Sequence, residues 1–219
     1  MLEMLEIEPR RAARCAVIWL HGLGADGNDF APLIRQWGLV DELGVRFVLP
    51  HAPQRPVTLN NGMVMRAWYD ICDLEFSRGE DRQGIEQSRQ QLLSLIERER
   101  ERGLPGENIL LAGFSQGGAL ALHTALRYTE SLAGVLVLSA YLPLAERLAA
   151  ERRADPDLLA IRMDHGKQDP VVQFAVAQRS CALLEKQGYR VDFHAYEMGH
   201  SLCPPQIESL KQWLARQLG

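Results

Sequence analysis

Residues 108–122 read "NILLAGFSQGGALAL", an apolar run joined to a helix-like run through three glycines and one serine. The junction fits the pattern G-x-S-x-G, with Ser115 between Gly113 and Gly117. This pattern is typical of a sharp strand-to-helix turn that lifts a serine hydroxyl above a sheet, and close backbone contacts there require small flanking residues. The positive end of the following helix would lie under the serine. We therefore expect a nucleophile at Ser115, with an incidental serine in a glycine-rich turn as the alternative.

Outward from this turn, strand-like runs rich in Val, Ile and Leu alternate with amphipathic helix-like runs. Such alternation predicts an α/β fold with a mostly parallel central sheet and helices on both faces. The chain has 219 residues, of which 47% are hydrophobic, so we expect a single α/β domain over residues 1–219. Residues 51–82 show weak periodicity, which favours a functional loop or a hidden element. The strand-like runs cover 15–20, 45–50, 108–114, 133–140, 157–163 and 190–197, and the helix-like runs cover 84–103, 117–132, 171–188 and 204–218.

A serine nucleophile needs a general base and an acid, and in this type of fold they follow it in the order acid, then histidine. Of the six histidines, His200 lies in the loop "EMGHSLCPP" after the last strand-like run, and the alternative for it is a plain surface histidine. The segment "MDHGKQDPVV" offers Asp164 at a strand end and Asp169 in the loop beyond it. We favour Asp169, because a loop carboxylate can reach the imidazole. It competes with a helix-capping role, which is common for aspartate.

A second glycine-rich stretch, "HGLGADGNDF" at residues 21–30, fits the written form of a dinucleotide fingerprint, G-x-G-x-x-G. That site needs an acidic residue at the end of the second strand, about 20 residues further on. Here the second strand ends "FVLPHAP", and the nearest acids, Asp41 and Glu42, precede that strand. The stretch is better placed to supply an oxyanion hole, formed by the backbone N–H groups of Leu23 and Gln116.

Composition narrows the classes of function. The net charge of −4 and the lack of a Lys/Arg stripe argue against nucleic acid as a partner. No apolar segment is long enough for a signal peptide or for stable membrane insertion. The four cysteines are scattered without a C-x-x-C pair, so we expect no metal, no cofactor and a cytoplasmic location.

Five stretches together resemble one family. The residues "HGLGADGNDF", "MRAWYDI", "GFSQGGALAL", "HGKQDPVV" and "MGHS" are similar to those of the small α/β hydrolases grouped as acyl-protein thioesterases, carboxylesterases and lysophospholipases, from about Val17 to the C-terminus. The resemblance implies an α/β-hydrolase fold without a large cap domain. It also implies a triad of Ser115, Asp169 and His200, with Leu23 and Gln116 as oxyanion donors.

The expected activity is that of a serine carboxylesterase acting on short- to medium-chain acyl esters through an acyl-enzyme on Ser115. The alternative is an acyl-protein thioesterase or a lysophospholipase that uses the same site. The partners would be a small-molecule acyl ester, a lysophospholipid or an acylated protein, and formation of a homodimer is left open. Methionines and aromatics in residues 61–82 suit an apolar pocket wall, although packing of the loop onto the sheet explains them equally well. The predicted substrate-binding residues are Met65, Trp68, Leu74 and Leu142.

Overall fold

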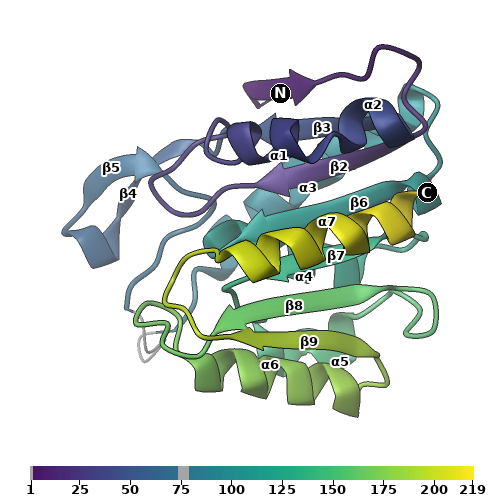
Figure 1. Cartoon of the computed structure of the whole chain (residues 1–219). Helices are drawn as coiled ribbons and strands as arrows, with labels where there is room; N and C mark the ends of the chain where they lie inside the picture. The colour runs from purple at the N-terminus through teal and green to yellow at the C-terminus, as the bar shows by residue number, and fades with distance from the viewer. Residues whose placement is uncertain (1, 74–78) are drawn as a thin grey trace.

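A central sheet runs through the computed structural model, which describes residues 2–73 and 79–219. Within these residues, seven strands form the sheet in the order β1-β3-β2-β6-β7-β8-β9 (Figure 1). All neighbouring pairs are parallel except β1 with β3. The carboxyl ends of the six parallel strands therefore meet at one edge, where open α/β sheets place their ligands. The strands are β1 Met4–Ile7, β2 Cys15–Leu20, β3 Val45–Pro50, β6 Ile109–Phe114, β7 Gly134–Leu138, β8 Ile161–Gly166 and β9 Val191–Tyr196.

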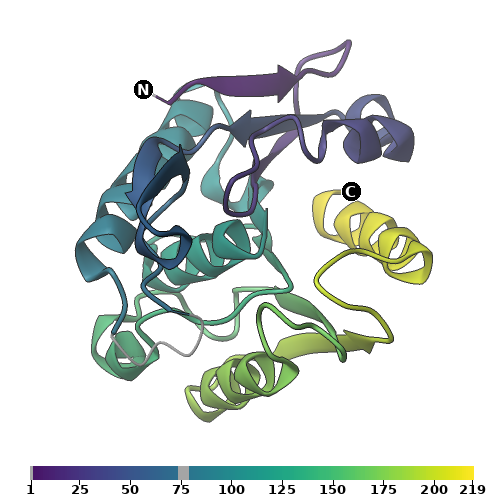
Figure 2. The same cartoon turned by 90° about the vertical axis from the view of Figure 1, so that its left-hand side faces the viewer.

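Helices cover both faces of the sheet, as the sequence predicted (Figure 2). One face carries α1 (Ala31–Trp37), α2 (Leu39–Leu43) and α7 (Pro204–Leu218). The other face carries α3 (Arg82–Glu101), α4 (Gln116–Arg127), α5 (Leu148–Glu151) and α6 (Phe174–Lys186). The described chain contains no large cap domain, and β7 is joined to β8 only through a short 3-10 turn and α5.

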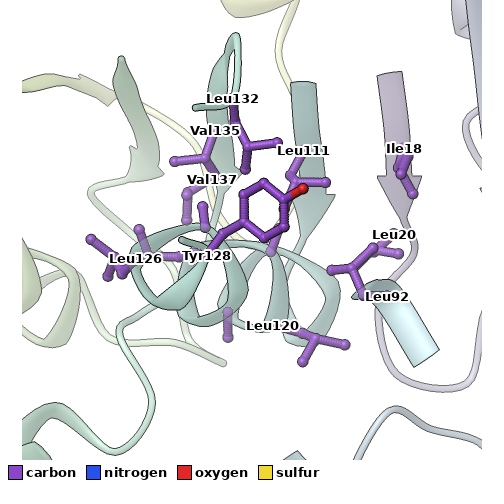
Figure 3. Packing of buried hydrophobic residues seen from close by; sticks show 14 of the residues in the cluster. Ile18, Leu20, Leu92, Leu111, Leu120, Leu126, Tyr128, Leu132, Val135 and Val137 are labelled. Carbon is purple, nitrogen blue, oxygen red and sulfur yellow. The ribbon is translucent and has the colours of Figure 1, made fainter. Parts of the chain in front are cut away.

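The core lies in two layers because successive strand residues point to opposite faces of the sheet. In β2, Ile18 and Leu20 pack toward α4, whereas Val17 and Trp19 pack toward α1 and α7. Helix α4 is buried along its whole length, with leucines that meet the strands on one side and α3 on the other (Figure 3). The element that follows Ser115 is thus held rigidly inside the molecule.

Several elements differ from the runs that the sequence predicted. Strand β1 was not predicted, because it is a short edge strand whose residues are only half-buried. Residues 51–82 contain a two-stranded hairpin, β4 (Gln54–Val57) and β5 (Met63–Arg66), which is the hidden element that the sequence analysis gave as one of two alternatives. The strand predicted at 157–163 starts at Ile161 and continues to Gly166, so Asp164 lies inside β8 and not at its end.

No helix in the described part of the chain combines the length and the apolar character that crossing a bilayer demands.

Candidate active site

Ser115 occupies the turn between β6 and α4, at the carboxyl edge of the sheet. Its backbone has φ 54° and ψ −122°, a conformation that residues other than glycine rarely adopt. Strained backbones of this kind occur mainly at functional sites. The N–H of Ser115 donates to the carbonyl of Leu138 on the neighbouring strand at 2.8 Å, which fixes the turn to the sheet. The hydroxyl is therefore presented at the edge by a strained but well-anchored backbone.

The glycines around Ser115 are needed for the close approach of two backbones. A Cβ on Gly117 would lie 2.4 Å from the carbonyl oxygen of Leu20, and one on Gly113 would lie 2.4 Å from the backbone of Gly117. No side chain fits at such distances, so the turn forms only with glycine at both positions. The requirement for small residues that was read from the sequence is confirmed by these contacts.

His200 and Asp169 are brought together from two different loops. The Nδ1 of His200 lies 2.7 Å from Oδ2 of Asp169, while Oδ1 of Asp169 accepts the N–H groups of Val171 and Val172 at 2.8 and 2.9 Å. Both carboxylate oxygens are thus engaged, and the side chain is fully buried. Because a carboxylate can only accept, the proton between the two groups sits on Nδ1 and leaves Nε2 free to act as a base.

The electrostatics of Asp169 favour the ionised form. Burial acts to raise its pKa, but the hydrogen bond from His200 and those from the two backbone N–H groups outweigh burial and leave the pKa below its ordinary value. The carboxylate therefore stays charged at neutral pH, as a group that orients an imidazole must.

The other acid considered, Asp164, is used elsewhere. Both of its oxygens accept from the guanidinium of Arg162, at 2.8 and 3.0 Å, and its side chain is fully buried on β8. The pair that the sequence favoured because Asp169 lies in a loop, Asp169 and His200, is the pair that the fold places in contact.

The ring of His200 lies against Phe114, the residue before Ser115, with ring centroids 4.8 Å apart. This contact places the imidazole beside the turn. Among the described residues the Ser115 hydroxyl makes no hydrogen bond, and in ligand-free enzymes the bond between nucleophile and base is often long until substrate binds.

The loop after β2 packs directly against the turn. A Cβ on Gly22 would lie 3.3 Å from the Phe114 ring and 3.4 Å from Cβ of Ser115. The backbone N–H groups of Leu23 and Gln116 have no acceptor among the described residues, and both residues line the same pocket as Ser115. Two unused donors beside a serine are suited to hold a negatively charged oxygen.

Three side chains hold this loop in place, and the sequence prediction assigned none of them that role. His21 is buried; its Nε2 accepts from Ala52 N at 3.0 Å, so its Nδ1 carries the proton and donates to the carbonyl of Gly22 at 2.7 Å. The side-chain amide of Gln116 accepts from Trp68 N at 2.8 Å and donates to the carbonyl of Tyr69 at 2.7 Å. Trp68 in turn donates from Nε1 to the carbonyl of His21 at 2.9 Å.

An apolar pocket opens beside Ser115, with a volume of about 70 Å³. It includes Leu23, whereas the predicted substrate-binding residues lie elsewhere or outside the described residues. Trp68 is only 1% exposed and donates to the carbonyl of His21 at the start of the loop after β2. Leu142 is packed in the core, and Met65 lies on β5 near Gly24. Leu74 falls outside the described residues. The pocket is lined by Leu23, Leu59, Tyr69, Ile71, Ser115, Gln116, Tyr141, Val171, Val172, Gln173 and Val176.

Some of these wall residues carried a signal in the sequence. Tyr69 and Ile71 belong to the stretch predicted as pocket wall, although Trp68 was chosen in their place. Val171 and Val172 follow Asp169 closely in "DPVVQ". Two apolar residues in the loop of a candidate catalytic acid indicate a pocket wall beside the site. Within residues 2–73 and 79–219, no three His, Cys, Asp or Glu side chains are grouped as metal ligands would be.

A parallel sheet with a strained serine between β6 and α4, and a histidine–carboxylate pair at the same edge, defines a class of enzyme. The protein is a serine hydrolase with an α/β-hydrolase fold. Residues 3–218 match the family described as Phospholipase/Carboxylesterase, and the chain belongs to that family.

Curated relatives agree with this assignment. Acyl-protein thioesterase 1 of Neurospora crassa is 39% identical over 212 residues, which cover 92% of this chain and 86% of the relative. Carboxylesterase SOBER1 of Arabidopsis thaliana is 32% identical over 209 residues, covering 94% of this chain and 92% of the relative. The crystal structure of acyl-protein thioesterase 2 of Zea mays superposes with a TM-score of 0.88 at 28% identity and covers 100% of both chains.

Proposed function

We propose that this protein is a serine carboxylesterase that hydrolyses short- to medium-chain acyl esters through an acyl-enzyme on Ser115. The observation that carries the proposal is the 2.7 Å contact between His200 and Asp169 beside a serine in a strained turn. A buried, charged carboxylate on Nδ1 and a mostly buried ring against the turn are what a catalytic histidine requires, and a plain surface histidine would have neither. The family and the relative named as a carboxylesterase support the same reading.

In the proposed reaction, the Ser115 oxygen attacks the ester carbonyl carbon while His200 Nε2 takes the hydroxyl proton. The carbonyl π electrons move to oxygen, and the resulting oxyanion accepts hydrogen bonds from the N–H groups of Leu23 and Gln116. Collapse of this intermediate breaks the bond to the alcohol, which leaves with the proton from His200. Water then attacks the acyl-enzyme with His200 again as the base, releasing the carboxylic acid and restoring Ser115.

The apolar wall suits an acyl chain of limited length. Valine, isoleucine and leucine side chains line the pocket beside Ser115. Each methylene of the acyl chain that is buried against them contributes roughly 0.8 kcal/mol to binding. The pocket encloses only the first few carbons of an acyl chain, and no large cap in the described chain extends it. We therefore expect the gain in kcat/KM with chain length to end within short and medium chains, at about four to ten carbons.

A second activity in the same site is acyl-protein thioesterase or lysophospholipase hydrolysis. The relatives named acyl-protein thioesterase 1 favour a thioester substrate on an acylated protein. Both activities use the same nucleophile, and they differ in the leaving group and not in the acyl pocket.

A cytoplasmic location is also proposed, because all four cysteines are unpaired, as in a reducing compartment.

The test combines a fluorophosphonate probe with a panel of acyl substrates. The probe is expected to label Ser115 alone, because only an activated hydroxyl reacts readily. Ser115→Ala removes the label and lowers kcat on p-nitrophenyl butyrate by about 10⁶, since the nucleophile is lost. The matched control is Ser201→Ala, which changes an exposed serine next to His200 in the sequence. This variant is expected to keep the label and the activity of the wild type. Labelling of another serine in a Ser115→Ala variant that still turns over substrate would end the proposal.

The same panel separates the two activities. Oxygen esters and thioesters of matched acyl length, from acetyl to palmitoyl, are compared by kcat/KM. A preference for medium-chain oxygen esters supports the carboxylesterase. Higher kcat/KM for a palmitoylated cysteine peptide than for any oxygen ester would assign the protein to the thioesterases.

A further inference from the structure

A second, larger cavity lies on the α3–α4–α5 side of the molecule, away from the carboxyl edge of the sheet. Its volume is about 390 Å³, within the range of roughly 300–1,000 Å³ that small-molecule sites occupy. Arg82 and Arg89 of α3, Arg127 of α4 and Arg153 after α5 contribute to its wall. The proposed hydrolysis uses none of these residues.

The cavity is positively charged in a protein whose net charge is −4. Its wall carries four arginines against two glutamates, Glu86 and Glu151, which leaves two positive charges if histidine is neutral. Arg89 pairs with Glu86 at 2.8 Å. Glu151 pairs with Arg127 at 3.0 Å and is shared with Arg147. No carboxylate among the described residues pairs with Arg82 or Arg153.

Two buried groups in the wall have unused hydrogen-bonding atoms. Arg127 has a side chain that is only 5% exposed; it donates from Nε to Glu151 and from Nη1 to the carbonyl of His123, but Nη2 has no partner among the described residues. His123 is 1% exposed, and its Nδ1 is likewise without a partner there. Buried polar atoms almost always have partners, so Nη2 of Arg127 and Nδ1 of His123 are two atoms in one cavity wall that are available to a bound group.

The local field agrees with this charge count. Burial and the charge of Arg127 lower the pKa of His123 to about 4. Burial also lowers the pKa of Arg127, although the hydrogen bond to Glu151 opposes it, and the nearby charge of Arg89 lowers it further. An anion in the cavity would therefore stabilise the charged form of Arg127, whereas His123 is neutral at neutral pH.

We propose that this cavity binds the phosphate group of a small phosphate monoester. A phosphate dianion matches the two uncompensated positive charges, and guanidinium groups form bidentate hydrogen bonds with phosphate oxygens. The remaining volume holds the organic part of the ligand. A soluble organic phosphate and the headgroup of phosphatidic acid share this chemistry.

The site is separate from Ser115. Helix α4 carries both, and a rise of 1.5 Å per residue places His123 about 12 Å and Arg127 about 18 Å along the axis from Ser115. Its occupation can therefore be measured independently of ester hydrolysis.

The test uses isothermal titration of the full chain with glycerol 3-phosphate at constant ionic strength. The wild type is expected to show one saturable site, and Arg82→Gln/Arg153→Gln, both exposed at the rim, to bind at least about tenfold more weakly. Arg35→Gln/Arg216→Gln removes the same charge from exposed positions on α1 and α7, and is expected to bind as the wild type does. In a second arm, co-sedimentation with phosphatidic acid vesicles shows whether the phosphate comes from a lipid.

Binding of either probe that is lost in the rim variant supports the site, and the arm that binds identifies the source. Absence of saturable binding in both arms, or equal binding by the rim variant, overturns the proposal. The single variants Arg82→Gln and Arg153→Gln provide the same comparison if the double variant unfolds. Turnover of p-nitrophenyl butyrate by the rim variant stays within about twofold of wild type, so failure of this proposal is distinct from failure of the proposed hydrolysis.

Discussion

Asp164 and Asp169 are five residues apart and both are buried, yet their partners give them different tasks. Asp164 neutralises Arg162 inside β8, and Asp169 holds the imidazole of His200 in the loop beyond it. At the scale of single residues, the partner and not the residue type decides what a carboxylate does.

Replacing each aspartate by asparagine is expected to separate activity from stability. Asp169→Asn favours the wrong tautomer of His200 and lowers kcat by about 10⁴, with a small change in the free energy of unfolding. Asp164→Asn leaves the buried Arg162 without a negative partner and costs about 3–5 kcal/mol of stability, while the folded fraction retains its activity. Ester hydrolysis and urea unfolding of both variants give the comparison, and the opposite ranking would move the acid to Asp164.

Trp68 illustrates the same dependence on contacts. Its indole packs on His21 with ring centroids 5.2 Å apart and donates to the carbonyl of that residue, so it supports the loop of Leu23 and does not line the acyl pocket. Any effect of Trp68 on catalysis is therefore expected to pass through this loop.

Trp68→Ala is expected to lower kcat/KM by the same factor for acetyl and octanoyl esters, because the change displaces the oxyanion donors and not the acyl wall. It also costs about 3–5 kcal/mol of stability, as truncation of a buried aromatic does. Kinetics on the two esters check this. A loss that grows with acyl length would show that the indole does contact the substrate.

At the scale of elements, an ion-pair network attaches strand β1 to helix α3 and strand β3. The fully buried carboxylate of Glu99 on α3 lies 2.6 Å from Arg46, 3.0 Å from Arg102 and 3.4 Å from Arg98. The two helix arginines continue to Glu6 on β1. Edge pairing alone would hold a four-residue strand weakly, and these contacts add to it.

Glu99→Gln is expected to destabilise the protein by about 3–5 kcal/mol, because it removes one partner from a buried charge network. The matched control is Glu97→Gln on the same helix, where Glu97 forms a surface ion pair with Arg100. This variant is expected to change the free energy of unfolding by less than about 0.5 kcal/mol. Urea denaturation measures both variants. Equal effects would mean that the network contributes no more than a surface ion pair.

At the scale of the whole molecule, three buried histidines make the fold sensitive to acid. Burial lowers the pKa of His21, of His165 and of His123, the last to about 4. Below about pH 6.5, the ordinary pKa of histidine, these three histidines bind protons in the unfolded chain but stay unprotonated in the folded chain. Stability is therefore highest above about pH 6.5 and falls as the pH decreases toward 4.

His123 alone is expected to account for about 3 kcal/mol of this loss between pH 6.5 and 4, from the size of its pKa change. His123→Gln removes that part, so the free energy of unfolding of the variant falls less steeply over this range than that of wild type. Urea titrations at several pH values, in buffers without phosphate, determine the slopes. Parallel slopes would mean that the folded protein protonates His123 freely.

The local part of the architecture was predictable from residue patterns. The glycines around Ser115, the runs that became β2, β3 and α7, and the candidates Asp169 and His200 all depend on rules that act over a few residues or on chain order. Short-range sterics and hydrophobic periodicity are properties of the chain itself, so they can be read before it folds.

Only the tertiary structure decided which side chains meet. The direction of Trp68, the contributions of Leu59 and Val176 to the pocket, the pairing of β1 and the arginine-lined cavity depend on elements that are far apart in the sequence. An exposed and a buried aromatic look alike in a sequence, because burial is a property of the neighbours that folding supplies. For this protein, the sequence determined the kind of chemistry and the order of its parts, and the packing of distant segments determined what surrounds them.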